Sequence, residues 1–191
     1  MHESFVVKIK QLLSTCQTDS FSVLHLSGQK FIVNFLFAMI EARQVQFCEI
    51  AAHFSSRADV SSRLRRIQGF FSDFLLNDLW LAHLILGWLP AGKLPLCLDK
   101  TNWQFGSVDI NILALTAAYR GVGVPVFFCL LAKKGNWASK ERIDLLQRFL
   151  EAFGSERIGS LIADREFIGT NWYTFLLQSQ IPFFIRLPKH H

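Results

Sequence analysis

Two apolar stretches that each end in an aspartate constrain the fold of this chain most. Asp99 follows Leu96-Cys97-Leu98, Asp164 follows Leu161-Ile162-Ala163, and both stretches have the pattern of a buried strand. A carboxylate at such a position is costly unless a cation or hydrogen bonds compensate its charge. The two aspartates are far apart in the sequence, so a folded scaffold of strands and helices has to bring them together. The alternative is that each Asp only caps a turn, a place that aspartate generally favours.

The aspartate pair predicts a site for a divalent metal ion. Mg²⁺ prefers oxygen ligands and is commonly held by one or two carboxylates, with water and substrate phosphate completing the octahedron. Asp99 and Asp164 supply that donor set, so we expect Mg²⁺, or Mn²⁺ in its place, to bind them. The four cysteines and six histidines are dispersed along the chain, which argues against a zinc site or a disulfide framework.

Two prolines and a glycine within residues 90–95 mark the expected domain boundary. We therefore expect a helical, helix-turn-helix-like DNA-binding domain over residues 1–90 and a second domain over residues 91–191. The periodicity of the first part predicts helices over residues 30–43, 47–54 and 57–74, the third with Ser56 as its N-cap. Residues 70–88 stay apolar and are predicted to form a helix that packs onto the next domain.

A cluster of arginines lies on the third predicted helix. The chain is basic, with a net charge of +5 and a pI of about 9.2, which is compatible with a polyanionic partner. On the last helix of a three-helix unit, arginines are placed to meet DNA phosphates or base edges. The alternative is an ordinary solvated helix face. The members of this cluster are Arg57, Arg63, Arg65 and Arg66.

The second part alternates strand and helix patterns. Strands are predicted over residues 94–99, 109–120 and 122–131, as an antiparallel meander with Gly121 at its second turn. A helix that Ser139 caps and Gly154 ends, a strand over 158–164, a helix over 170–178 and a strand over 181–187 follow. The order βββαβαβ is that of a ribonuclease-H-like α/β fold, in which the fourth strand lies beside the first. In that fold Asp99 and Asp164 would share one metal site.

Several motifs resemble the DDE transposases of the insertion-sequence-four group of bacterial elements. The similar stretches are Asp99-Lys100-Thr101-Asn102-Trp103 with Phe105-Gly106, Lys133-Lys134-Gly135-Asn136, Glu141-Arg142-Ile143-Asp144-Leu145-Leu146, Ala163-Asp164-Arg165-Glu166-Phe167-Ile168-Gly169, and Arg63-Leu64-Arg65-Arg66-Ile67-Gln68-Gly69-Phe70-Phe71. Singly each motif is weak, and together they are specific.

The resemblance implies cut-and-paste DNA transposition by a homodimer that binds double-stranded DNA at the transposon ends and joins it to target DNA. Asp99 and Asp164 would match the first two catalytic acids. Lys100 and Arg165 adjoin them, either to steer phosphate or to form salt bridges. The family's third acid lies on a later helix, beyond the residues of this sequence. We therefore expect the N-terminal part of a transposase with an incomplete core, inactive by itself.

Two alternatives remain open, a DNA-binding fragment that inhibits transposition and an inert fragment with an exposed apolar sheet face. No run reaches the roughly 18 to 20 apolar residues that span a bilayer, and residues 1–13 lack the pattern of an export signal. With reduced, buried thiols expected, we predict a protein of the bacterial cytoplasm, associated with the nucleoid and with no membrane partner.

Overall fold

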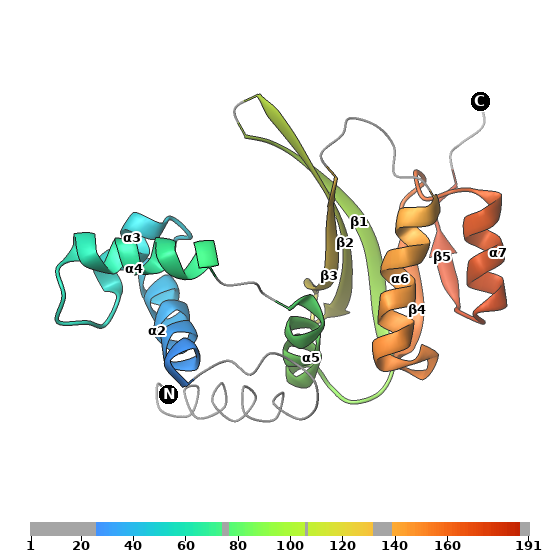
Figure 1. Cartoon of the computed structure of the whole chain (residues 1–191). Coiled ribbons are helices and arrows are strands. Elements are labelled where there is room, and N and C mark those ends of the chain that lie inside the picture. Colours follow the sequence, from blue (N-terminus) through green and yellow to red (C-terminus); the bar gives the residue numbers. More distant parts are fainter. Residues whose placement is uncertain (1–25, 74–76, 106, 132–138, 188–191) are drawn as a thin grey trace. The chain divides into compact units, whose positions relative to one another are not determined.

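The computed structural model of the chain describes residues 26–73, 77–105, 107–131 and 139–187 (Figure 1). The chain folds into two compact units, Met1–Trp80 and Leu81–His191. The division falls inside helix α5 (Asp78–Trp88), whereas the sequence pattern places the boundary in residues 90–95. Residues 1–13 and the Lys133-Lys134-Gly135-Asn136 motif lie outside the described residues.

The first unit contains three helices in its described part, α2 (Leu26–Ala42), α3 (Phe47–His53) and α4 (Val60–Asp73). These helices match the three predicted ones, with ends shifted by a few residues. The rings of Phe31 and Phe70 stack with their centres 4.0 Å apart, and Phe54 packs against Phe31 at 5.4 Å. The buried core of this unit consists of Phe31, Ala38, Ile50, Ala51, Phe54 and Ile67.

Two predictions about helices are wrong, the residue that caps α4 and the single helix over residues 70–88. Asp59, not Ser56, caps α4, because the helix begins at Val60 and the Asp59 carboxylate accepts a 2.8 Å hydrogen bond from the Ser62 amide. Residues 70–88 do not form one helix, since α4 ends at Asp73 and α5 begins at Asp78. Asn77 starts the second helix by accepting hydrogen bonds from two amides of its first turn.

The second unit is a mixed α/β structure built on a five-stranded sheet. Its strands are β1 (Leu94–Phe105), β2 (Val108–Tyr119), β3 (Val122–Leu131), β4 (Ile158–Ala163) and β5 (Phe183–Ile185), in the spatial order β3-β2-β1-β4-β5. β1, β2 and β3 pair antiparallel, whereas β4 pairs parallel with β1 and with β5. The predicted meander and the predicted neighbouring of the first and fourth strands are confirmed. β5 is shorter than the predicted strand over residues 181–187.

The β2–β3 connection is a tight hairpin turn. Arg120 and Gly121 both have positive φ, 51° and 80°, between the paired residues Tyr119 and Val122. Positive φ at both central residues is the geometry of a type I′ turn, which matches the twist of the flanking strands. Gly121 therefore serves the turn as the sequence predicted.

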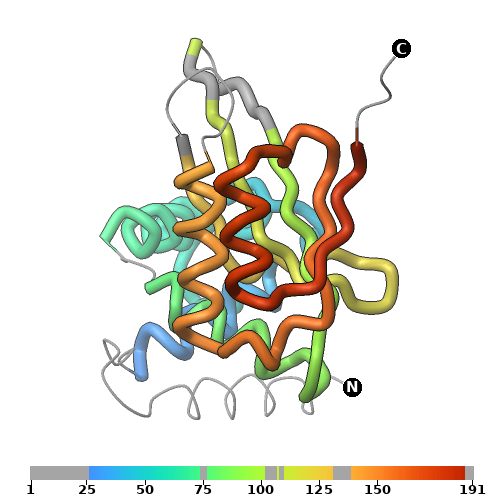
Figure 2. The backbone as a smooth tube through the Cα atoms, turned by 90° about the vertical axis from the view of Figure 1, so that its right-hand side faces the viewer, coloured from blue at the N-terminus to red at the C-terminus, as the bar shows by residue number. Residues whose placement is uncertain are grey.

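Helices α6 (Ser139–Phe153) and α7 (Thr170–Gln178) lie side by side against one face of the sheet, with the short helix η1 (Ser155–Arg157) after α6 (Figures 1 and 2). Leu96, Leu98 and Leu161 are buried on the sheet, and Phe149 and Trp172 are buried on the helices. Exposed apolar side chains also lie on the strands, at Phe128, Leu130, Ile162 and Phe184.

The three cysteines in the described part of the chain are free thiols, as expected, but none of them is buried. Cys48 is exposed, and Cys97 and Cys129 are half-buried. Across the described residues no single helix combines the length and apolar composition needed to cross a membrane, although two bent helix pairs reach it on those two criteria alone.

Candidate functional site

Strand pairing brings the two aspartates to matching positions in the sheet. In the parallel β1–β4 pair, Leu98 is the register partner of Ala163. Each is followed at once by an aspartate, so the two aspartates take neighbouring positions, Asp99 within β1, which continues to Phe105, and Asp164 directly after the last residue of β4. Both side chains are exposed, whereas Leu98 and Ala163 are buried.

Each aspartate is oriented by the amide that follows it. Asp99 Oδ1 accepts a hydrogen bond from the Lys100 amide at 2.8 Å, and Asp164 Oδ1 accepts one from the Arg165 amide at 2.7 Å. Burial, and secondly the charge of Asp99, raises the pKa of the Cys97 thiol above its ordinary value. Cys97 and Asp99 are two positions apart on β1 and therefore share one face of the sheet.

A tight turn follows Asp164. The amide of Phe167 donates to the carbonyl of Asp164 at 3.0 Å, which closes the turn directly after β4. Phe167 is only 1% exposed and anchors the turn in the core of the unit. The position of the Asp164 backbone is therefore coupled to the packing of Phe167.

An ion pair joins the two aspartate motifs. Lys100 Nζ, next to Asp99 on β1, contacts Glu166 Oε2 in the turn after β4. The sequence left open whether Lys100 steers phosphate or forms a salt bridge, and the structure shows the salt bridge. Arg165 is exposed, and its backbone serves Asp164.

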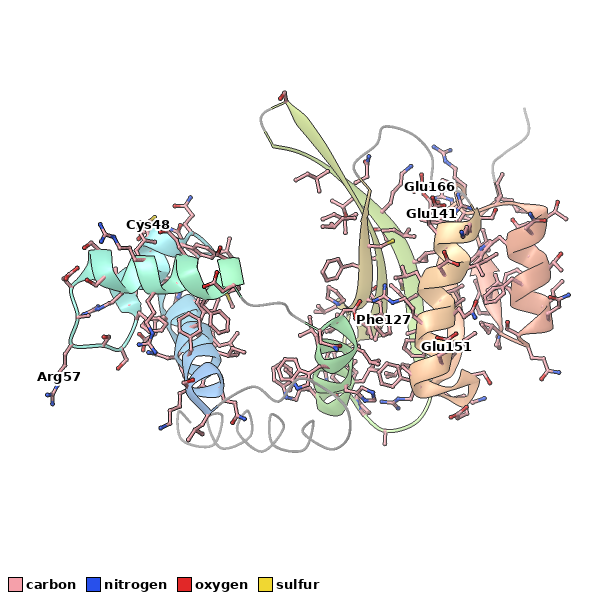
Figure 3. The ribbon with its side chains drawn as sticks, viewed as in Figure 1. Cys48, Arg57, Phe127, Glu141, Glu151 and Glu166 are labelled. Atoms are coloured by element: carbon pink, nitrogen blue, oxygen red, sulfur yellow. The ribbon has the colours of Figure 1, made fainter. Side chains whose placement is uncertain are left out.

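Arg142 holds the same turn from the helix side. This residue of α6 is 6% exposed, and its guanidinium donates to the carbonyls of Glu166 and Ile168, each at 3.2 Å. Its central carbon lies 5.1 Å from the centre of the Phe167 ring. Figure 3 labels Glu141 and Glu166 in the region of the N-terminal end of α6, and the charges of both act on Arg142. Burial lowers the pKa of Arg142, and the charges of Glu166 and Glu141 oppose that change.

The donor chemistry at this site suits a hard divalent cation. Two carboxylates at neighbouring positions of adjacent strands match the one or two that a Mg²⁺ site takes from a protein. Across residues 26–73, 77–105, 107–131 and 139–187, no group of three or more His, Cys, Asp and Glu side chains is placed to hold a metal ion. Glu166 pairs with Lys100, so its carboxylate has a partner other than a metal.

The arginines of the first unit have different surroundings. Arg63 donates to backbone carbonyls of Ala52 at 3.3 Å and Ser56 at 2.8 Å, and its Nε donates to Ala58 at 2.7 Å. The guanidinium of Arg66 lies over the rings of Phe31 and Phe54 at 5.6 and 5.9 Å. Arg57 and Arg65 are exposed, and Figure 3 shows Arg57 pointing away from the helices of its own unit.

Arg142 is the residue of this site that sequence reasoning missed. Its place in the sequence, in the first turn of the predicted helix and within one of the motifs, did not mark it as a site residue, although it lies at the buried helical spacing of Leu146 and Phe149. A charge on the apolar stripe of a helix is a signal that the sequence contains, because a buried charge needs partners.

No protein-family model matches the chain, and no curated protein matches it. Among solved structures, the chain is similar to one in the cryo-EM structure of the simian T-cell lymphotropic virus intasome in complex with PP2A regulatory subunit B56 gamma, with a TM-score of 0.40 and 12% identity. The similarity covers 72% of this chain and 47% of that one, less than half of its length. At this TM-score the similarity assigns neither a fold family nor a function to the chain.

Proposed function

We propose that this chain is a DDE-type transposase of the insertion-sequence-four group, or the N-terminal part of one, with a ribonuclease-H-like core. The observation that carries the proposal is the parallel register of Leu98 and Ala163, after which Asp99 and Asp164 follow at neighbouring positions on two adjacent strands inside the sheet. The strand order β3-β2-β1-β4-β5, with a meander followed by two parallel strands, supports the same core.

In this proposal Asp99 and Asp164 hold one or two Mg²⁺ or Mn²⁺ ions. A bound divalent ion supplies Lewis-acid stabilisation of the charge that develops during phosphodiester hydrolysis and strand transfer. The amides of Lys100 and Arg165 fix one oxygen of each carboxylate and so restrict the orientation of both ligands. Arg165 is exposed beside Asp164 and is placed to contact a DNA phosphate.

The partner in this proposal is double-stranded DNA, as transposon ends and as target, in the bacterial cytoplasm, and the complete enzyme acts as a homodimer. Arg57, Arg65 and Arg66 are all exposed, but Arg66 lies over the rings of Phe31 and Phe54, so we assign Arg57 and Arg65 to DNA phosphates. Arg63 and Arg66 are engaged within the helical unit and support the helices that present the other two. Lys100 contributes positive charge beside the aspartates while paired with Glu166.

Mn²⁺ titration followed by electron paramagnetic resonance tests the metal site without requiring catalysis. We expect the wild-type chain to bind Mn²⁺, and Asp99→Asn and Asp164→Asn each to weaken binding at least tenfold, because each removes a direct ligand. Asp144→Asn is the matched control, since Asp144 is an exposed carboxylate on α6 outside the site. Equal Mn²⁺ affinity in all four proteins would contradict the proposal.

A second candidate function is DNA binding without catalysis, including inhibition of transposition by occupying DNA ends. It is favoured by the described residues, in which no third carboxylate joins Asp99 and Asp164. DNA binding measured with and without Mg²⁺, together with nicking of supercoiled plasmid, separates the two candidates. If Asp99→Asn binds DNA as tightly as the wild type and the wild type does not nick plasmid when Mg²⁺ is present, DNA binding without catalysis is supported.

A further inference from the structure

The turn after β4 is held from two sides. From β1, Lys100 pairs with the side chain of Glu166. From α6, the two terminal nitrogens of Arg142 donate to the backbone carbonyls of Glu166 and Ile168. These carbonyls flank Phe167, whose ring lies under the guanidinium.

Arg142 suits this task better than another residue would. Its planar fork presents two donors at a fixed spacing, which matches two carbonyls separated by one residue. The side chain is 6% exposed, so these carbonyls would otherwise face a buried position with few alternative donors. A residue needed only to fill this position on the helix would be apolar, as Leu146 and Phe149 are.

The clamp reaches Asp164 through the backbone. Phe167 donates its amide to the Asp164 carbonyl at 3.0 Å, so fixing Glu166 and Ile168 on either side of Phe167 also fixes that hydrogen bond. The amide of Arg165, which orients the Asp164 carboxylate, lies inside the same turn.

We propose that Arg142 is a positioning residue that sets the orientation of Asp164 by clamping the carbonyls of Glu166 and Ile168. By fixing Glu166, it also fixes the partner of Lys100 beside Asp99. The inference deepens the proposed function and rests on it, because the orientation matters as that of a metal ligand.

Two substitutions on one helix test the inference. Arg142→Met removes the donors and keeps an aliphatic side chain. Arg148→Met is the matched control, because Arg148 also lies on α6 with its guanidinium over an aromatic ring, that of Phe127 on β3, at 4.7 Å. Should Arg142→Met fail to fold, Arg142→Lys, which keeps the charge and loses the fork, takes its place.

The first readout is amide hydrogen exchange at Phe167 in the metal-free full chain, relative to the global stability of each variant. We expect Arg142→Met to speed this exchange about tenfold beyond any change in global stability, and Arg148→Met to leave it unchanged. Unchanged exchange at Phe167 in Arg142→Met overturns the inference, whatever the metal site does.

The second readout is Mn²⁺ affinity, with paramagnetic broadening of the Lys100 and Arg165 amides as the local probe. Loss of an outer partner of a metal ligand typically weakens metal binding about 10- to 100-fold, so we expect about a tenfold loss in Arg142→Met. A merely structural role predicts lower stability with unchanged Mn²⁺ affinity, and that result overturns the inference. Absence of Mn²⁺ binding in the wild type refutes the proposed function instead, and the exchange measurement still decides whether Arg142 clamps the turn.

Discussion

Lys100 and Glu166 form an ion pair that ties β1 to the turn after β4, beside both candidate metal ligands. The two side chains are 23% and 32% exposed, so solvent and salt screen their attraction. The pair therefore orders the site more than it stabilises the fold.

A double-mutant cycle with Lys100→Met and Glu166→Gln tests the strength of this pair. We expect a coupling free energy of about 0.5 kcal/mol, within the range of partly exposed ion pairs, and a smaller value at high ionic strength. Denaturant unfolding of the four proteins at two salt concentrations gives the value. Glu151→Gln, on α6, is the control, because the hydrogen bond that Glu151 accepts comes from the uncharged side chain of Gln147. A coupling that is unchanged at high salt would contradict an electrostatic origin.

Gly169 ends the same turn and starts α7 with a backbone that only glycine adopts readily. Its φ is 149° and its ψ is 141°, and an added Cβ would lie 3.3 Å from the Ser139 hydroxyl. We expect Gly169→Ala to lower the free energy of unfolding by about 1–3 kcal/mol, the cost of holding a side-chain-bearing residue in this region.

Gly69, in the middle of α4, gives the opposite expectation. Apart from its chain neighbours and the backbone of its own helix, no described atom lies within 4 Å of an added Cβ there. Alanine is favoured over glycine in a helix by about 0.5–1 kcal/mol. Gly69→Ala should therefore raise the stability of the helical unit. Thermal unfolding followed by circular dichroism measures both variants, and a shared sign would show that backbone conformation does not govern these positions.

The helices and strands of the second unit were predictable because the hydrophobic periodicity and the glycine, proline and capping residues indicate the same element boundaries. The helix over residues 170–178 has the predicted bounds, and β3 matches residues 122–131. The start of α4, in the first unit, was missed because Ser56 and Asp59 are both good capping residues and each accepts a hydrogen bond from a following amide, Ala58 and Ser62 respectively. Only the fold shows that the helix begins after Asp59.

In the candidate site, the positions of the aspartates were predictable from the sequence and the roles of the arginines were not. The order of the elements predicts that the first and fourth strands are parallel neighbours, as they are in the structure. The sequence therefore sufficed to predict that Asp99 and Asp164 take neighbouring positions. The roles of the arginines could not, because the carbonyls that Arg63 and Arg142 reach lie on other segments of the chain. Side-chain donors of this kind are identified only once the turns they hold are formed.

Arg63 is predicted to be a stability residue of the helical unit. Its guanidinium serves the carbonyl of Ala52 at the end of α3, which lacks a helical partner, and those of Ser56 and Ala58 in the following loop. We expect Arg63→Met to cost about 1.5–3 kcal/mol, the range for hydrogen bonds to charged groups. Arg65→Met, at an exposed position of the same helix, should change stability by no more than about 0.5 kcal/mol. Denaturant unfolding decides, and equal costs would refute the assignment.

Arg57 and Arg65 are predicted to act on DNA instead. Each phosphate contact adds about 0.9 to the slope of log affinity against log salt concentration for duplex DNA. Arg57→Ala with Arg65→Ala should therefore weaken DNA binding and reduce that slope by about two, without loss of stability. Lys30→Ala, an exposed basic residue of α2 in the same unit, is the control. Fluorescence anisotropy over a salt series measures the slope, and an unchanged slope in the double variant would remove these residues from the DNA interface.

Asp59 makes the helical unit sensitive to acid. The Ser61 hydroxyl, and then the amide and hydroxyl of Ser62, donate to its carboxylate and lower its pKa from 3.8 to about 2. Because the folded pKa lies below the unfolded one, the charged cap stabilises the fold above pH 3.8, and that contribution is lost as the pH falls toward about 2.

Asp59→Asn keeps an oxygen for the Ser62 amide but has no charge to lose. The melting temperature of the wild type should therefore fall more steeply than that of Asp59→Asn between pH 3.8 and about 2, so that the two curves converge at the acid end. Ser56→Ala, which loses only the hydrogen bond from the Ala58 amide, should follow the steeper wild-type curve. Parallel curves for the wild type and Asp59→Asn would show that the charge of Asp59 makes no contribution to folding.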